Sequence, residues 1–416
     1  MKKILSSIVV LAAALMVTTV APVQQTQAAT GNPVVKWNEI ALNTITSDTT
    51  RGTPSAASLY VAMVQAAVYD AVMAIKPTHE PYIFDGDAPG ASTDAAVATA
   101  AHDVLVKYFG STSSLESAYA QSLAEIPNGA SKNAGVRVGQ QAAAAIIAAR
   151  ANDGRNTAVA PPPDGNEPGE WVRTGSGNVV TPYVAQVRPF LAESPEQFRA
   201  KGPLPIDSHR YAVEFERTRL YGAFHSPVRS EEQTEIARFW TENTLRQYNR
   251  ALRGLALERS LSTVDTARLF AMTDIPAADA MITCWNTKFH HLAWRPVTAI
   301  RNADTDSNDR TTADPNWQPL STTALHPEYV SGHACLTGAI TRGLEEFFGT
   351  KKIDLQIDSI VTGSTHHFPT VDDLRKEVED ARVFGGDHWD TGGSDGTLLG
   401  HNLAKWALKR YFERSK

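Results

Sequence analysis

Three short clusters of the sequence contain residue types that can bind and transform an anion. In the first cluster, Lys288 and Arg295 are seven positions apart, and Pro296 follows the arginine. Seven residues span about two helical turns, so a helix would present both cations on one face, with Pro296 at its end or at a kink. The pair could then hold one anion from two points. Taken alone, two such cations are more typical of a solvated helix face.

The second cluster, Ser331-Gly332-His333, precedes a segment with helical character at 334–348. A helix start presents free backbone N–H groups and a partial positive charge, Gly332 permits close approach, and the Ser331 hydroxyl adds a donor. His333 would project from the first turn and exchange a proton with an anion oxygen. The alternative is that Ser331 only caps the helix and His333 bonds locally.

In the third cluster, Arg382 and His388 are six positions apart, with Gly385 and Gly386 between them. The two glycines allow the chain to bend, so that both side chains can converge on one ligand. The guanidinium would bind two oxygens at once, while a neutral imidazole nitrogen would bond the central atom. The cluster therefore completes the functional groups that a bound oxyanion requires.

The elements that must position these clusters are predicted to be helices. Helical periodicity predicts helices over 59–75, 95–108, 113–126, 131–150, 208–222, 230–252, 257–295, 334–348 and 397–412. A short run at 355–361 has strand character. The sequence therefore predicts an all-α protein.

The domain organisation follows from a break in this pattern. Residues 152–205 are rich in Gly, Pro and Asn, which cannot continue a helix, and the 416-residue chain exceeds the usual size of a single core. We therefore expect two packed subdomains or one large helical assembly. The predicted regions are a signal peptide at 1–28, an N-terminal helical region with a long crossover at 29–205, and a C-terminal bundle carrying the site at 206–416.

The N-terminus and the overall charge restrict the location and the partners. Met1-Lys2-Lys3, an apolar run over 4–23 and a small-residue end at Ala28 are typical of a secretory signal, so we expect export to the periplasm or the medium. We expect no membrane span after the signal is cleaved. A net charge of -6 without a basic stripe argues against nucleic acid. The sequence does not indicate an oligomeric state.

Two cysteines, Cys284 and Cys335, are too few for a disulfide scaffold. A bridge between them would join two of the clusters, whereas two separate core thiols are the other interpretation.

Read in order, Lys-x6-Arg-Pro, Ser-Gly-His and Arg-x5-His resemble the tripartite signature of the vanadium-dependent haloperoxidase and type 2 phosphatidic acid phosphatase superfamily. The blocks at 294–301 and 381–386 are similar to the secreted bacterial haloperoxidase branch. The resemblance covers the chain from about residue 285 onward, while the N-terminal half is similar only in helical character and size. It implies two helical bundles of the vanadium chloroperoxidase and acid phosphatase type.

The resemblance also implies a cofactor and residue roles. Vanadate would be the cofactor, and phosphate can occupy the same site. Its implied ligand set is Lys288, Arg295, Ser331, Gly332, Arg382 and His388, with His388 bonding the metal. The implied catalytic residues are His333 as acid–base, Lys288 as the group that polarises peroxide, and His388. The implied substrates are hydrogen peroxide, halide and a small organic acceptor, with hypohalous acid as the product.

The sequence departs from the family pattern at three positions. Val330 replaces a common proline, Ala381 replaces a serine frequent in phosphatases, and Gly392 replaces a common aspartate four positions after His388. The last departure leaves open which group orients the His388 imidazole, and Asp387 and Asp390 are the nearest candidates.

Three functions are compatible with these clusters. The first is a haloperoxidase whose halide stays open, because Trp285 resembles chloroperoxidases and His326 resembles bromoperoxidases. The second is a secreted acid phosphatase, in which His388 would form a phosphohistidine and His333 would protonate the leaving group. The third is a non-catalytic oxyanion-binding protein, which would need the cations but not the two imidazoles.

Overall fold

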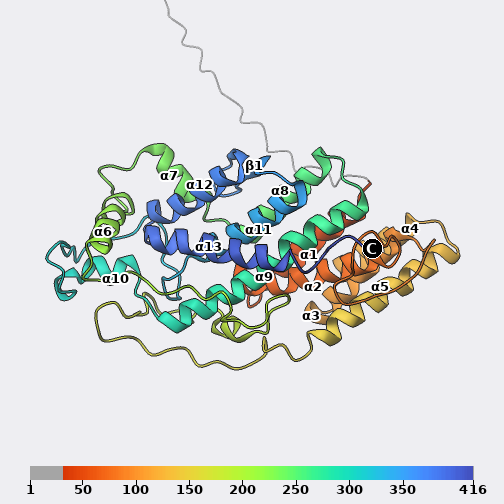
Figure 1. The fold of residues 1–416 in the computed structure, drawn as a ribbon, viewed down its shortest axis with the longest axis horizontal. Helices are drawn as coiled ribbons and strands as arrows, with labels where there is room; N and C mark the ends of the chain where they lie inside the picture. Colours follow the sequence, from red (N-terminus) through yellow and green to blue (C-terminus); the bar gives the residue numbers. More distant parts are fainter. Residues whose placement is uncertain (1–30, 416) are drawn as a thin grey trace, which may run out of the picture.

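The computed structural model describes residues 31–415, which form thirteen α-helices, two short 3-10 helices and one two-stranded sheet. The all-α prediction is therefore confirmed. The molecule is elongated, with the N-terminal helices at one end and the helices α6 (His209–Tyr221) and α10 (Pro296–Arg301) at the other (Figure 1). The signal peptide predicted at 1–28 lies outside the described residues.

The N-terminal helices form the first bundle. They are α1 (Pro33–Thr46), α2 (Pro54–Met73), α3 (Thr93–Phe109), α4 (Ser113–Ala124) and α5 (Ala130–Ala149). The helix α5 lies very close to α3, because a Cβ at Gly139 would stand only 2.5 Å from the carbonyl oxygen of Ala96. Small residues thus bring these two backbones together, and the bundle packs around α2.

The second bundle contains the remaining helices and the sheet. Its elements are α6 (His209–Tyr221), α7 (Glu231–Phe239), α8 (Thr244–Glu258), α9 (Thr263–His291), α10 (Pro296–Arg301), the 3-10 helix η2 (Ala303–Thr305), α11 (Gly332–Phe348), β1 (Lys352–Asp358), β2 (Thr365–Thr370), α12 (Val371–Phe384) and α13 (Asp390–Ala407). The strands pair antiparallel, and Leu355 faces Phe368.

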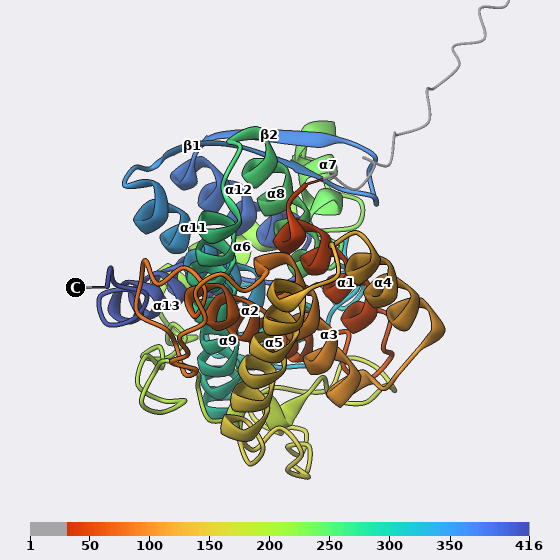
Figure 2. The same cartoon turned by 90° about the vertical axis from the view of Figure 1, so that its right-hand side faces the viewer.

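The long helix α9 joins the two bundles. It packs against α2 on the side of the first bundle and against α11 and α13 on the other, and Figure 2 shows α2 beside α9. One hydrophobic core therefore continues from α1 to the C-terminal residues. This core includes residues on both sides of position 205 and does not divide there. The domain boundary expected at residue 205 stays a prediction.

The crossover between the bundles is irregular except for the 3-10 helix η1 (Pro182–Gln186). It is fixed by buried charges: Asp279 of α9 accepts three backbone N–H groups from residues 190–192. The segment predicted as a crossover is thus bound to α9 along part of its length.

One of the predicted helices is interrupted. The helix predicted over 230–252 is wrong, because α7 ends at Phe239 and α8 begins at Thr244. Between them the fully buried Trp240 enters the core, and the Asn243 side chain caps α8 by accepting from the Arg246 N–H. The predicted strand corresponds to β1, and its partner β2 was not predicted.

Within residues 31–415, one helix is long and apolar enough to cross a membrane, and it is α2. By length and composition alone, α2 therefore differs from the expectation that no membrane-spanning segment follows the signal peptide. Its apolar window is wholly buried inside the protein, as in the central helix of a core.

Candidate active site

The three sequence clusters meet at one cavity of about 210 Å³ in the second bundle, next to the start of α2. Five of the seven predicted site residues line it, namely Arg295, Gly332, His333, Arg382 and His388. Its other walls include Trp285, His326, Met281, Leu336 and residues 53–55. Lys288 and Ser331 lie behind the wall. Segments about 100 residues apart in the chain therefore contribute to one site.

Lys288 lies in a helix and Arg295 does not, so the prediction that one helix face carries both is wrong. Lys288 lies in the last turn of α9, and Leu292 ends that helix in the left-handed region at φ 49°. Arg295 stands immediately before Pro296, which begins α10. The two cations thus approach the site across a turn.

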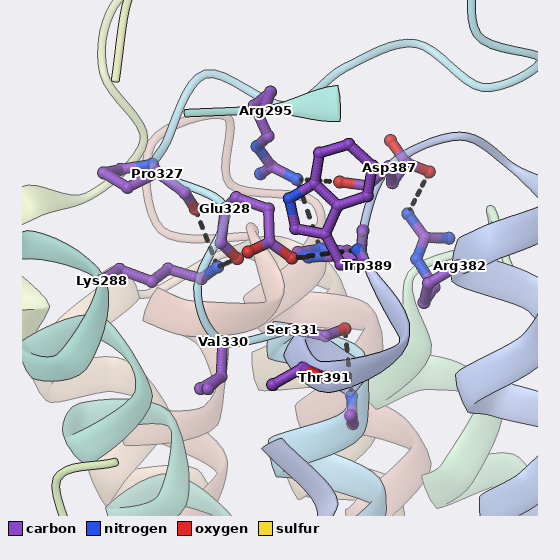
Figure 3. A network of polar contacts seen from close by, with 12 residues as sticks. Lys288, Arg295, Pro327, Glu328, Val330, Ser331, Arg382, Asp387, Trp389 and Thr391 are labelled. Carbon is purple, nitrogen blue, oxygen red and sulfur yellow. Dashed lines mark hydrogen bonds and ion pairs between the residues drawn. The ribbon is translucent and has the colours of Figure 1, made fainter. Parts of the chain in front are cut away.

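Lys288 is completely buried and supports the loop that precedes Ser331. Its Nζ donates to the carbonyl oxygens of Pro327 and Glu328, each at 2.9 Å (Figure 3). Burial and the neighbouring Arg295 charge lower the pKa of Lys288, which is about 8. Its positive charge therefore acts next to the cavity, and its donors position the loop.

Arg295, also fully buried, connects two of the clusters. Its Nε donates to the carbonyl oxygen of His326 at 2.8 Å, and its Nη1 donates to that of Asp387 at 2.9 Å. Nη1 also lies 3.2 Å from Nε2 of His388. Burial lowers the pKa of Arg295 to about 10. The guanidinium thus stays charged near neutral pH.

Arg382 carries the clearest sign of a binding function. Its Nη2 pairs with Oδ2 of Asp387 at 2.6 Å, but its Nε and Nη1 are buried without a hydrogen-bond partner among residues 31–415. Buried donors are costly unless something accepts from them. Because the side chain lines the cavity, an oxyanion there would satisfy both donors, and the site therefore fits vanadate or phosphate.

The chain turns sharply between Arg382 and His388, so that both residues reach the cavity. Gly386 adopts φ 77°, and a Cβ there would lie 2.7 Å from the carbonyl oxygen of Gly222. A larger residue would therefore be strained as well as crowded at this turn.

His388 is held by a glutamate that the sequence did not indicate. Oε1 of Glu328 lies 2.8 Å from Nδ1 of His388. The two candidates near His388 are engaged elsewhere, since Asp387 pairs with Arg382 and Asp390 pairs with Arg217. Neither of the two candidate aspartates therefore orients the imidazole. The only signal in the sequence was the missing aspartate at position 392.

His333 lies in the first turn of α11, where Ser331 is the N-cap residue. Its Nε2 lies 3.0 Å from the carbonyl oxygen of Trp240, which can only accept, so this nitrogen carries the proton. Nδ1 is then the nitrogen that can accept one. The Ser331 side chain accepts from the Ala334 N–H at 3.5 Å, so here the hydroxyl acts as a helix cap.

Both imidazoles are neutral in this environment. Burial, reinforced by the cations around the cavity, lowers the pKa of His333 and of His388 well below the usual value. A neutral imidazole is the form that can bond a metal or accept a proton. Burial also raises the pKa of Glu328 to about 7.

Cys284 and Cys335 are both buried and free, so a bridge between the clusters is not formed. Trp285 lines the cavity, with its ring centroid 5.0 Å from that of His326. The two residues with opposed halide implications are thus in contact, and the halide stays open.

Comparisons with known proteins agree with this arrangement. A family model described as "VCPO second helical-bundle domain" matches residues 268–415, the part that contains all three clusters. The vanadium chloroperoxidase of Curvularia inaequalis is 29% identical over an alignment that covers 32% of this chain. That alignment spans only 26% of the relative's length.

Two solved structures share the fold over nearly the whole chain. A bacterial vanadium-dependent iodoperoxidase has a TM-score of 0.78 at 21% identity, covering 92% of this chain and 98% of that one. A holo-type bacterial vanadium-dependent chloroperoxidase has a TM-score of 0.71 at 19% identity, with the same coverage of both chains. The predicted helical-bundle fold is therefore confirmed, in the first bundle as well as the second.

Proposed function

We propose that the protein is a vanadium-dependent haloperoxidase, because residues 268–415 match the family model of the VCPO second helical-bundle domain and contain the three clusters that meet at the cavity. It would use hydrogen peroxide to oxidise a halide to hypohalous acid, with a small organic molecule as the acceptor. The observation that carries the proposal is the cavity in which the free donors of Arg382 and the neutral His388 imidazole meet. The predicted secretory signal adds the proposal that the enzyme is exported.

The residues divide between holding the anion and moving a proton. Arg295 and Arg382 would neutralise the oxygens of vanadate, with the Gly332 N–H as a further donor at the start of α11. Nε2 of His388 would bond the metal. When bound, vanadate would supply a Lewis acid that activates hydrogen peroxide toward halide. Nδ1 of His333 would take up a proton in the cavity and return it.

Lys288 is not among the residues that line the cavity. Its ammonium group donates to two backbone carbonyls and lies behind the cavity wall, so we propose that it supports the loop at 326–331 and adds positive charge to the site. Direct polarisation of peroxide by Lys288 stays a prediction.

The acid phosphatase remains a specific alternative, because the pairing of Glu328 with His388 would also suit a histidine nucleophile. The test is halogenation of a phenol reporter by the purified protein with peroxide and bromide, beside hydrolysis of a chromogenic phosphate ester. Halogenation that depends on vanadate and is suppressed by phosphate would support the proposal. Ester hydrolysis without halogenation would replace it with the phosphatase.

The variant His333→Ala distinguishes the proposed enzyme from a non-catalytic oxyanion-binding protein. We expect halogenation to fall by roughly 100- to 10,000-fold, the usual contribution of an acid–base residue, while vanadate binding persists. The matched control is His367→Ala, since that histidine is exposed on β2 and bonds Asp354. Equal activity in the two variants would contradict the role of His333.

A further inference from the structure

We propose that Glu328 is a positioning residue that fixes the His388 imidazole with its Nε2 lone pair toward the anion. This inference rests on the proposed function only in naming vanadate as the anion. Glu328 is fully buried, and its Oε1 also accepts the Trp389 N–H at 3.3 Å. One carboxylate oxygen therefore contacts both the imidazole and the backbone at the start of α13.

The neighbours of His388 determine which nitrogen carries its proton. Nε2 lies 3.2 Å from Nη1 of Arg295, and a guanidinium can only donate. A proton on Nε2 would set two donors against each other. The proton must therefore lie on Nδ1, where Glu328 accepts it at 2.8 Å. Together Arg295 and Glu328 select the tautomer in which Nε2 carries the lone pair, which accepts from Arg295 in this structure.

The backbone of Glu328 is fixed independently of its side chain. Its N–H donates to the carbonyl oxygen of Ala293 at 2.9 Å, and its own carbonyl accepts from Lys288 at 2.9 Å. Figure 3 shows the Glu328 side chain between Lys288 and Trp389, reaching away from the loop that carries it. Lys288 thus positions the loop, the loop positions the carboxylate, and the carboxylate positions the imidazole.

Space for this carboxylate exists because residue 392 is a glycine. A Cβ at Gly392 would lie 2.2 Å from Oε1 of Glu328, well inside any real contact. The close approach is maintained by the Ser331 N–H, which donates to the Gly392 carbonyl at 2.8 Å. A side chain at 392 and the glutamate at 328 therefore exclude each other. Here the carboxylate that orients the imidazole comes from the loop before α11 and not from α13.

The experiment uses vanadate-free protein and measures the His388 tautomer by imidazole 15N NMR, with the resonance assigned by its loss in His388→Ala. The wild type is expected to show a protonated Nδ1. In Glu328→Gln, which retains an acceptor, the Nδ1 proton resonance should move upfield, because a neutral acceptor forms a weaker hydrogen bond. Glu328→Ala should give a mixture of tautomers.

The same variants are then titrated with vanadate. Loss of a group that orients a metal ligand typically weakens binding by about 10- to 100-fold, which we expect for Glu328→Ala, with a smaller loss in Glu328→Gln. Gly392→Ala should match Glu328→Ala, because the added methyl group displaces the carboxylate. If Glu328→Gln leaves the Nδ1 resonance unmoved, or Glu328→Ala leaves vanadate affinity unchanged, the proposal is overturned.

The outcome is separable from that of the proposed function. The tautomer and the affinity are measured without peroxide or halide, so a protein that passes both tests yet never halogenates would refute the haloperoxidase alone.

Discussion

Arg150 and Arg382 are both buried arginines, one at the crossover and one at the cavity, but the protein satisfies them differently. Arg150 donates to the carbonyl oxygens of Arg188 and Pro189 and pairs with Asp153 at 2.9 Å. Arg382 has one partner, Asp387, and two buried donors without any among residues 31–415. Arg150 therefore has its partners within the protein, whereas Arg382 keeps two donors that a ligand could use.

The surroundings of the two arginines show the same contrast. Near Arg150, the carboxylate of Asp279 accepts three N–H groups from the crossover, and Asp153 also pairs with Arg155. We call Arg150, Asp153, Arg155 and Asp279 the crossover cluster. Around Arg382 the cations outnumber their carboxylate partners. A buried charged side chain therefore indicates a binding site only when some of its donors or acceptors have no partner in the protein.

The largest effect on stability is expected for Arg150→Ala. Removing one partner of a buried ion pair typically costs about 3–5 kcal/mol, so the free energy of unfolding should fall by that order. Vanadate affinity should stay within about twofold of the wild type, since the crossover cluster has no part in the cavity. Urea unfolding and vanadate titration of the same sample measure both. A matching loss of vanadate affinity would show that the crossover cluster also supports the cavity.

The crossover cluster should also impose a pH dependence on stability. Burial raises the pKa of Asp279 from 3.8 to about 6, outweighing its three backbone hydrogen bonds. A carboxyl whose pKa is higher in the folded protein stabilises it below the unfolded value. That contribution is lost as pH rises through about 6.

Over this interval Asp279 would remove up to about 3 kcal/mol from the free energy of unfolding. Asp279→Asn does not titrate, so its unfolding free energy should vary less between pH 4 and 6. Urea unfolding at several pH values measures both proteins. Parallel profiles for the two would show that Asp279 does not titrate in this range.

Arg382→Lys should affect the anion and leave the fold nearly unchanged. Lysine keeps the charge beside Asp387 but loses the planar donors that bind two oxygens at once. We expect vanadate affinity to fall by roughly 10- to 30-fold, or about 1.4–2 kcal/mol. Arg150→Lys is the matched control, with an expected loss of stability and no loss of affinity. If Arg382→Lys and Arg150→Lys bound vanadate equally, the unpaired N–H donors of Arg382 would not contribute to vanadate binding.

The smallest effect is expected from a reductant. Cys284 and Cys335 are free, so the elements around the cavity are held by hydrogen bonds and packing, with no bridge between these two residues. Dithiothreitol should leave the thermal unfolding midpoint of the vanadate-free protein unchanged. A lower midpoint in dithiothreitol would show that a disulfide joins Cys284 and Cys335 beside the cavity.

Five of the seven predicted site residues line one cavity, and the sequence could indicate them because each cluster is local. Gly385 and Gly386 indicated the turn before His388, and Ser331 indicated the start of α11. The orientation of Lys288 and Arg295 was not predictable from their spacing. Leu292 ends α9 in the left-handed region, and that turn depends on the tertiary structure rather than on helical periodicity.

Glu328 was missed for a different reason. Its contact with His388 joins residues 60 positions apart, and no local pattern marks a glutamate as the partner of a distant imidazole. The sequence contained only the complementary signal, Gly392, whose lack of a side chain provides the space. Similarly, the break between α7 and α8 depends on the burial of Trp240, which helical periodicity does not reveal.

We propose that the cavity containing Arg382 and His388 holds one vanadate and that this vanadate supports halogenation. The most direct measurement is the bromination rate of phosphate-free protein as vanadate is added stepwise at a protein concentration well above Kd. We expect a linear rise that stops at one vanadate per chain. A rate that stays at the level without protein at every vanadate concentration would contradict it.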